Sequence, residues 1–280
     1  MKAIILNLSA WVMLPVMDGF AKYLSSTLPI LQITWSRYFF TVVFVLPIML
    51  VFFRKNLTWT EQPKLQLIRG LLLFCANILF FYSISIISLA KALTLAFIAP
   101  LIVTLLSPIL LGEKVGFRRW AAVIVGFIGS LIVIRPGFVE FNLASFAALG
   151  TGVMYGFYLI VTRKLHNSDN PLLTLLLTGT VGAILGSIIM PTVWVQPTIN
   201  EWYMMFAIGF FASLGHFFLI LSLRYADASK LAPFGYFEIV PNIIIGYFFF
   251  NHFPNQWHFL GLFIIISSGI YIFRREMLNM

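Results

Sequence analysis

Ionisable side chains in apolar surroundings are the residues of this chain best suited to do chemistry. "VMDGFAKYL", residues 16–24, puts Asp18 and Lys22 inside a long apolar stretch. Arg37 in "WSRYFF", His216 in "SLGHFF" and Glu238 in "YFEIVP" have similar surroundings. A charge at the centre of a bilayer costs roughly 2.5–3.5 kcal/mol, so such groups face a bundle interior or a wet cavity. There they can bind a charged solute or carry a proton.

Asp18 and Lys22 are four residues apart, so on a helix they share one face and can pair. Arg37 lies at a similar depth, five residues into the next apolar segment. These two cations and one anion leave a surplus positive charge. A substrate carboxylate or phosphate would satisfy it, because a guanidinium suits bidentate contact. The alternative is a structural ion-pair network in which Lys22 extends outward.

His216 and Glu238 are the candidates for taking up and releasing protons. Histidine titrates near neutral pH, and an internal repeat described below aligns Asn77 with His216. Such a pair suits a central binding site, although polar contacts between helices are the alternative. Glu238 lies between Pro233 and Pro241, which disturb the helix and free carbonyls. It can bind an ammonium group or a proton; structural pairing with Asp227 or Lys230 is the alternative.

Aromatic residues make up 17% of the chain and mostly suit lipid contact and interfacial belts. Four of them are predicted at the cavity, for packing or cation–π contact with a substrate: Trp35, Tyr82, Tyr155 and Tyr236. "GAILG", residues 182–186, has small residues at helical spacing, which favours packing within the monomer over a homodimer.

Composition places these residues in a membrane. Of 280 residues, 61% are hydrophobic and 10% charged, whereas soluble domains carry roughly a quarter charged residues. The net charge of +9 is explained by cytoplasmic loops, with no nucleic acid as partner. The first apolar stretch has no clear cleavage site, so we interpret it as a retained helix. The single Cys75 excludes an internal disulfide.

Ten segments approach the roughly 20 apolar residues that a membrane-spanning helix needs. They are Ala3–Ser25, Gln32–Phe53, Leu67–Ile87, Ala92–Leu111, Trp120–Ile134, Leu143–Thr162, Leu172–Val193, Trp202–Leu223, Leu231–Phe250 and Trp257–Phe273. With both termini in the cytoplasm, fourteen of the eighteen Lys and Arg residues, Arg69 among them, fall in cytoplasmic segments. Outer loops hold only Lys91 and Arg135. The predicted fold is an all-α integral membrane protein of ten helices.

An internal repeat divides these helices into two sets of five. "VMDGF" at residues 16–20 recurs as "VMYGF" at residues 153–157. A shift of 139 residues superposes three further pairs: Gly70 on Gly209, Ser83 on Ser222 and Lys91 on Lys230. Because five is odd, the second copy must be inverted. Residues 1–137 and 138–280 are therefore predicted as inverted repeats, an architecture in which secondary transporters bind substrate between the copies.

Three segments resemble the EamA-type members of the drug/metabolite transporter superfamily: "ITWSRYFF", "APLIVTLLSPILLGEKV" and "LRYADASKLAPFGYFEIVP". The resemblance covers essentially the whole chain and implies a transporter of small organic solutes. The segments "DGFAKYL" and "ADASKLAPFGYFE" are most similar to those of the bacterial subset assigned to metabolite or S-adenosylmethionine uptake. One departure is that the second copy has Asn251-His252 where the first has Gly112-Glu113.

The function predicted is secondary transport of a small polar or zwitterionic metabolite, amino-acid-like or S-adenosylmethionine-like, across the inner membrane. Alternating access would be driven by a gradient or by exchange, with protons as a coupling ion. Alternatives are export of drugs or organic cations, riboflavin- or nucleoside-type uptake, a channel or a scaffold. No phosphate-binding G-x-x-x-x-G-K-[ST] motif is present. A membrane-embedded enzyme that holds a metal would need clustered Asp or His residues. The acidic residues of this chain are isolated in sequence, and His252 and His258 have no further obvious metal ligand nearby, so this function is disfavoured. No metal or cofactor is expected.

Overall fold

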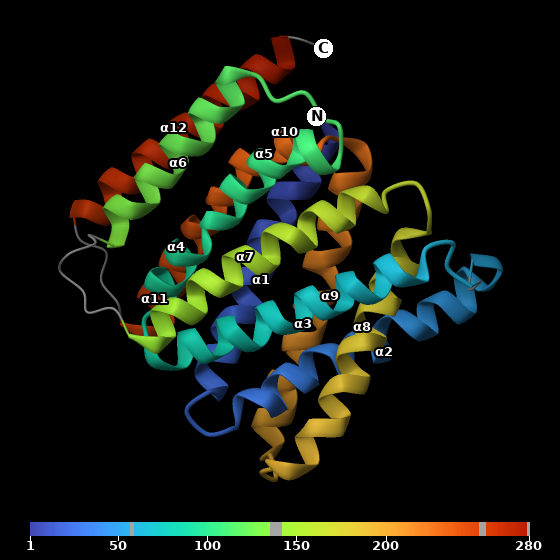
Figure 1. The fold of residues 1–280 in the computed structure, drawn as a ribbon. Coiled ribbons are helices and arrows are strands. Elements are labelled where there is room, and N and C mark those ends of the chain that lie inside the picture. Colours follow the sequence, from blue (N-terminus) through green and yellow to red (C-terminus); the bar gives the residue numbers. More distant parts are fainter. Residues whose placement is uncertain (57–58, 135–141, 252–255, 279–280) are drawn as a thin grey trace.

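The computed structural model describes residues 1–56, 59–134, 142–251 and 256–278, and over these residues the chain is helical without strands (Figure 1). Eight segments within them are long and apolar enough to cross a membrane. They are α1 (Lys2–Leu24), α2 (Ile30–Phe52), α3 (Pro63–Ile86), α4 (Leu89–Ala96) with α5 (Ile98–Leu110), α7 (Leu143–Lys164), α8 (Pro171–Ile189) with η2 (Met190–Thr192), α9 (Ile199–Tyr225), and α10 (Ala228–Leu231) with η3 (Ala232–Glu238) and α11 (Ile239–Phe250). The predicted all-α membrane fold is confirmed.

The fifth and tenth predicted spans coincide with helices α6 (Phe117–Ile134) and α12 (Gln256–Leu278). In α12 the apolar stretch is the shorter Phe259–Tyr271. A short 3-10 turn, η1 (Arg54–Asn56), follows α2. Arg135, His252 and the predicted boundary between residues 137 and 138 lie outside the described residues, as does the side chain of His258.

Two of the predicted continuous spans are broken. The first divides at Phe97 into α4 and α5, because Pro100 has no N–H to offer the carbonyl of Ala96. The second divides into α10, the 3-10 segment η3, which begins at Ala232-Pro233, and α11. The expectation that prolines disturb the helix around Glu238 is confirmed.

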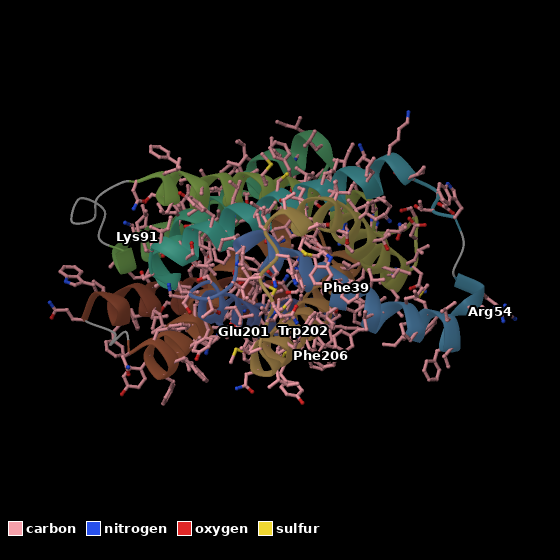
Figure 2. The ribbon with its side chains drawn as sticks, turned by 90° about the horizontal axis from the view of Figure 1, so that it is seen from below. Phe39, Arg54, Lys91, Glu201, Trp202 and Phe206 are labelled. Atoms are coloured by element: carbon pink, nitrogen blue, oxygen red, sulfur yellow. The ribbon has the colours of Figure 1, made fainter. Side chains whose placement is uncertain are left out.

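The helices form a bundle with α1, α3, α7 and α9 in its middle, and the α6–α12 pair lies along one edge (Figure 1). α1 packs along α9, and α3 packs along α7; α2 contacts both α8 and α9. α1 begins and α12 ends toward the same end of the bundle (Figure 1). Arg54 and Lys91 project from opposite ends (Figure 2).

Left-handed backbone occurs at two places in the described part of the chain. Gly112 has φ 68° and follows the end of α5, and Asn251 has φ 54° and ends α11. Glycine and asparagine are the residues that most readily adopt this conformation after a helix. The two positions are 139 residues apart, the shift at which the sequence repeats.

Arg69 corrects the sequence prediction. It was assigned to a cytoplasmic segment, but α3 begins at Pro63, one and a half turns earlier, and Arg69 is completely buried between α3, α7 and α8. The small residues of "GAILG" behave as predicted, since Gly182 and Gly186 of α8 lie against Tyr38 and Trp35 of α2 in the same chain.

The repeat-related glycines Gly70 and Gly209 allow helices to approach closely. A Cβ at Gly209 would lie 2.2 Å from Phe40 Cβ, and one at Gly70 would lie 2.7 Å from Val181 Cβ. We expect either alanine substitution to destabilise the protein by about 1–3 kcal/mol through overpacking. Apparent melting temperatures in detergent would measure this. Gly269→Ala is the control, because nothing lies within 4 Å of its Cβ; an equal loss there would contradict the packing argument.

Candidate functional site

A cavity lies between α1, α3, α4–α5, α7, α9 and the α10–η3 segment. The space between its wall atoms, open solvent at its mouth included, is about 900 Å³. Five of the nine predicted substrate-binding residues lie on its wall: Asp18, Asn77, Tyr155, His216 and Glu238. They come from five different helical segments, so the fold brings together residues that are up to 220 positions apart.

The rest of the cavity wall is mainly apolar and aromatic, with Trp11, Phe80 and Phe97 its largest rings. Trp11 packs edge-on to Tyr155 with ring centroids 6.3 Å apart. Its Nε1 donates to Asn7 Oδ1 at 2.7 Å, and Asn7 is also on the wall. Sequence reasoning missed both Asn7 and Trp11. The signal was present, because Asn7 is a polar residue four positions before Trp11 in an apolar helix.

The carboxyl groups of Asp18 and Glu238 are the acidic groups of this cavity. Asp18 is 3% exposed, and neither carboxylate forms an ion pair within the described residues. The two carboxyl groups are close enough to interact electrostatically, and Asp18 also interacts electrostatically with Arg37. The predicted pairing of Asp18 with Lys22 is not formed, and Asp227, suggested as a partner of Glu238, pairs with Arg163 instead.

Arg37 stands behind His216 and is not on the wall of the large cavity. Its Nη2 lies 2.6 Å from His216 Nε2, and its Nε lies 3.3 Å from Met17 Sδ. On the other side of the ring, Nδ1 lies 2.9 Å from the Tyr158 hydroxyl, to which Arg69 Nη2 donates at 2.8 Å. A buried chain of Arg37, His216, Tyr158 and Arg69 therefore crosses the bundle beside the cavity.

Trp35, Tyr82 and Tyr236 are not on the cavity wall, contrary to prediction. Trp35 Nε1 donates to Ser187 Oγ at 3.0 Å, and its ring stacks on Phe39 in the contact between α2 and α8. Tyr82 is partly buried on α3. Tyr236 packs edge-on to Phe97 with ring centroids 5.1 Å apart, and its buried hydroxyl has no hydrogen-bond partner among the described residues.

Two basic side chains bind the carbonyls at helix ends on either side of the cavity. Lys22 Nζ donates to the carbonyl of Ile84 at 2.7 Å and to that of Ile87 at 3.1 Å. Arg163 Nη1 donates to the carbonyl of Leu223 at 2.8 Å. The last carbonyls of a helix lack internal partners, so each cation satisfies an otherwise open acceptor. We call these contacts the Lys22 latch and the Arg163 latch.

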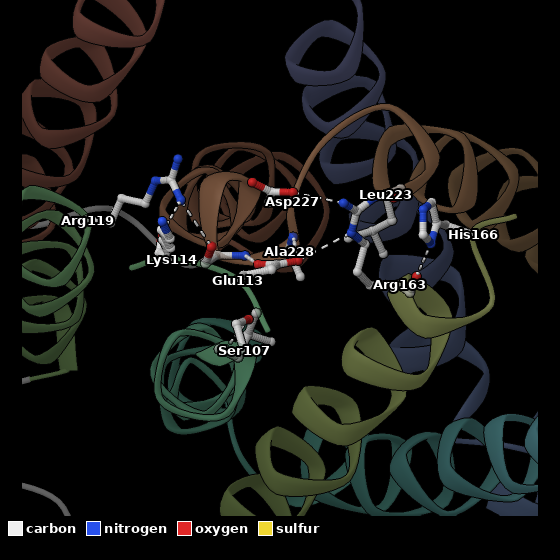
Figure 3. A network of polar contacts seen from close by, with 11 residues as sticks. Ser107, Glu113, Lys114, Arg119, Arg163, His166, Leu223, Asp227 and Ala228 are labelled. Atoms are coloured by element: carbon white, nitrogen blue, oxygen red, sulfur yellow. Dashed lines mark hydrogen bonds and ion pairs between the residues drawn. The ribbon is translucent and has the colours of Figure 1, made fainter. Parts of the chain in front are cut away.

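The Arg163 latch is part of a larger polar network (Figure 3). Glu113 accepts hydrogen bonds from the backbone N–H groups of Ala228 and Ser229, each at 2.9 Å. Arg163 Nε lies 3.2 Å from Glu113, and Arg163 Nη2 lies 2.8 Å from Asp227. Because Ala228 also lines the cavity, this network borders the cavity wall.

Both the sequence and the fold of this chain are similar to those of known proteins. A model of the EamA-like transporter family matches residues 1–135 and 142–274. The chain belongs to the EamA-like transporter family. A solved crystal structure with 18% sequence identity has the same fold, at a TM-score of 0.77, over 95% of this chain and 94% of its own.

Curated relatives of this EamA-like transporter have different solutes in their names. The S-adenosylmethionine uptake transporter of Rickettsia bellii is 30% identical over 259 residues, which is 92% of this chain and 89% of the relative. The riboflavin transporter of Vibrio cholerae is 27% identical, covering 96% and 92%. The pseudopaline exporter CntI of Pseudomonas aeruginosa is 27% identical, covering 93% and 92%. The predicted multi-pass inner-membrane transporter is confirmed.

Glu113 belongs to the Gly112-Glu113 pair of this EamA-like transporter, and its surroundings set its charge. Burial acts to raise the pKa of Glu113, but the hydrogen bonds from Ser229 and Ala228 and the charge of Arg163 outweigh it and hold the pKa below its ordinary value. A depressed pKa contributes stability that is fully present above the pKa of the unfolded chain. That stability is lost as pH falls through the folded pKa.

We therefore expect the melting temperature of the wild-type EamA-like transporter to fall more steeply than that of Glu113→Gln between pH 6 and about pH 3, where carboxylates titrate. Near neutral pH the variant should melt lower, because a neutral amide binds Arg163 less strongly. Thermal unfolding in detergent across this range would measure both. Glu61→Gln, at an exposed position, is the control. Parallel curves for wild type and Glu113→Gln would refute a native ionised Glu113.

Proposed function

We propose that this EamA-like transporter moves a small organic metabolite with a cationic group across the inner membrane by alternating access. The observation that carries the proposal is the pair of carboxyl groups, Asp18 and Glu238, on a mainly apolar and aromatic cavity wall. A carboxylate removed from water is costly unless a cation compensates it. A cationic solute would supply that compensation, and Trp11 and Tyr155 would add cation–π contacts.

An S-adenosylmethionine-like solute fits this wall best. Such a molecule combines cationic groups with a flat aromatic base, which matches two carboxylates beside aromatic rings. The 30% identity to an S-adenosylmethionine uptake transporter adds support. Riboflavin-type uptake is the second candidate, favoured by the relative from Vibrio cholerae, whereas the exporter relative leaves the direction of transport to experiment. The proposed activity is transport without covalent chemistry.

We further propose ten spans, α6 and α12 included, arranged as inverted repeats over residues 1–137 and 138–280. Three observations support the repeat. The family model matches twice, to residues 1–135 and 142–274. The left-handed residues Gly112 and Asn251 are 139 positions apart. The packing partners exchange as a two-fold axis requires, since α1 packs on α9 and α7 packs on α3.

The latches support the proposed inversion. Lys22 near the end of α1 reaches the end of α3, so α1 and α3 end together. Arg163 near the end of α7 reaches the end of α9. Lys2 Nζ donates to the Tyr225 hydroxyl at 3.1 Å, so α9 ends where α1 begins. The corresponding helices of the two halves therefore end at opposite ends of the bundle.

Both termini are proposed to lie in the cytoplasm. Lys2 and Arg163 both contact the end of α9, at Tyr225 and Leu223. Arg54 projects from the end of the molecule opposite Lys91 (Figure 2). Lys and Arg favour cytoplasmic loops. In this orientation the Arg163 latch closes the cavity toward the cytoplasm and the Lys22 latch lies on the outer side.

Protons are the proposed coupling ion, with Glu238 as the group that exchanges them against the solute. His216 is less suited than predicted, because a guanidinium cannot accept a hydrogen bond and His216 Nε2 must therefore accept one from Arg37. A proton at Nε2 would break that contact. We therefore assign His216 to positioning Arg37 and Tyr158 beside the cavity.

Glu238→Gln tests the cation site and the coupling together. We expect uptake of labelled S-adenosylmethionine into proteoliposomes, driven by an imposed pH gradient, to fall about tenfold or more, because the ionised hydrogen-bond acceptor is lost. The melting temperature should be retained, since glutamine has nearly the same shape. Glu61→Gln is the matched control at an exposed position. Wild-type uptake by Glu238→Gln would rule out both roles for Glu238.

Weakening each latch tests alternating access. In a Cys75→Ser background, a cysteine at Val103, which lines the cavity on α5, reports access. We expect Arg163→Met to raise its labelling by a membrane-impermeant maleimide from the cytoplasmic side several-fold, because the carbonyl and carboxylate contacts of Arg163 are lost. Lys22→Met, at the other latch, should not. Equal labelling in the two variants would contradict the assignment of the latches to opposite sides.

A further inference from the structure

A second, smaller cavity lies behind His216; all the space between its wall atoms, open solvent included, is about 230 Å³, so it suits a compact ligand. Its walls come from α2, α3, α7, α8 and α9, and His216 lines both cavities. Its polar wall residues are Arg37, Tyr38, Thr41, Tyr158, Thr178 and His216. No carboxylate is on this wall.

Arg37 has a donor to spare in this cavity. The side chain is 2% exposed, and its Nε and Nη2 are occupied by Met17 and His216. A guanidinium has five N–H groups, so donors remain even though Arg37 also interacts with the Tyr38 hydroxyl, with its guanidinium carbon 4.6 Å from the centre of the Tyr38 ring. A buried guanidinium N–H without an acceptor is costly.

The hydrogen bonds of His216 fix where the Tyr158 proton points. Because Arg37 can only donate, His216 Nε2 accepts, and the neutral ring then carries its proton on Nδ1. Nδ1–H donates to the Tyr158 hydroxyl at 2.9 Å, and Arg69 Nη2 donates to the same oxygen at 2.8 Å. With two bonds accepted, the Tyr158 O–H is itself left as a donor.

Tyr38 is in the same position. Its hydroxyl accepts a hydrogen bond from Asn77 Nδ2 at 2.8 Å, and its own proton has no acceptor among the described residues. That hydroxyl makes no hydrogen bond to the described threonines of this wall, whose own protons go to carbonyls: Thr41 donates to that of Arg37 and Thr178 to that of Thr174.

Charge points the same way as the donor count. Arg37 and the fully buried Arg69 stand on either side of His216 and Tyr158, and neither forms an ion pair in the described part of the chain. Buried charges are normally paired, so two guanidinium groups without a carboxylate partner among the described residues favour a nearby anion.

We propose that the cavity behind His216 binds a small monovalent anionic group, with Arg37, the Tyr38 hydroxyl and the Tyr158 hydroxyl as donors. The group is either a free anion such as chloride or the carboxylate of the transported solute reaching past His216. Both have the same chemistry, that of a compact acceptor with one negative charge. The site complements the proposed cation site and is independent of it, except where the solute supplies the carboxylate.

Thermal unfolding of the purified full chain tests the site without any solute. Sodium chloride or sodium bromide is titrated against sodium gluconate, at constant sodium and ionic strength. We expect a saturable rise in melting temperature with the halides, because gluconate is too large for the cavity. A rise that does not saturate, or one that gluconate produces equally, would overturn the proposal.

Tyr38→Phe locates the site, because it removes one donor and keeps the ring. We expect its half-saturating halide concentration to rise about tenfold, as for the loss of a hydrogen bond to a charged group. Tyr236→Phe is the matched control, since that hydroxyl is buried but is on neither cavity wall; it should titrate as wild type. Arg37→Gln should abolish saturation if the variant folds. Identical titrations of Tyr38→Phe and Tyr236→Phe would refute the assignment.

S-adenosylmethionine and its carboxyl methyl ester identify the source of the anionic group. If the solute supplies it, saturating S-adenosylmethionine abolishes the halide response and the ester does not. If a free anion occupies the site, the halide response persists with both compounds. This arm rests on the proposed function, whereas the halide titration does not, so the two can fail separately.

Discussion

The constraint on which the structure depends is that lipid cannot solvate a charge. Every ionisable group within the bundle must therefore find compensation inside the protein. Lys22 and Arg163 find it at the open carbonyls of helix ends, and Arg69 finds it in hydroxyl and carbonyl oxygens. Asp18 and Glu238 are left facing the cavity. The proposed function assigns transport to them, because a solute or a proton would supply their compensation.

The sequence predicted the spans well because a helix in lipid must be apolar over a fixed length. It also predicted which polar residues approach the cavity, since the cost of burying Asp18 or Glu238 demands a wet surface whatever the fold. Partners were harder to predict. Lys22 and Asp18 have helical spacing, but Lys22 instead donates to two carbonyls at the end of α3. The sequence around Lys22 does not indicate that these carbonyls lie nearby.

Aromatic residues gave the least reliable predictions. Trp35 and Tyr82 have the composition of a binding wall, but a ring suits lipid, a helix interface and a cavity equally. The orientation of a helix about its own axis decides among these surroundings. In an apolar segment without a polar stripe, the sequence does not indicate that orientation. Tyr155 does lie on the cavity wall, and it occupies the position of Asp18 in the recurring segment "VMDGF"/"VMYGF".

The two latches differ in chemistry although they hold equivalent helix ends. The Lys22 latch uses carbonyls, whereas the Arg163 latch adds Glu113 and Asp227. The Glu113 carboxylate comes from the Gly112-Glu113 turn in the first half of the chain and contacts Arg163 in the second half. The counterpart of this turn is Asn251-His252, which contains no acidic residue. Among the described residues, Arg163 thus contacts two carboxylates as well as a carbonyl, whereas the Lys22 latch consists of contacts to carbonyls.

The contact between Phe97 and Tyr236 has a geometric consequence. These residues are 139 positions apart, so under the proposed two-fold relation each is the counterpart of the other, and counterparts that touch must meet on the axis itself. A point on the axis is unmoved when the halves trade conformations. The ring pair would then be the fulcrum about which the broken helices α4–α5 and η3–α11 tilt, keeping its own geometry while both mouths of the pathway change.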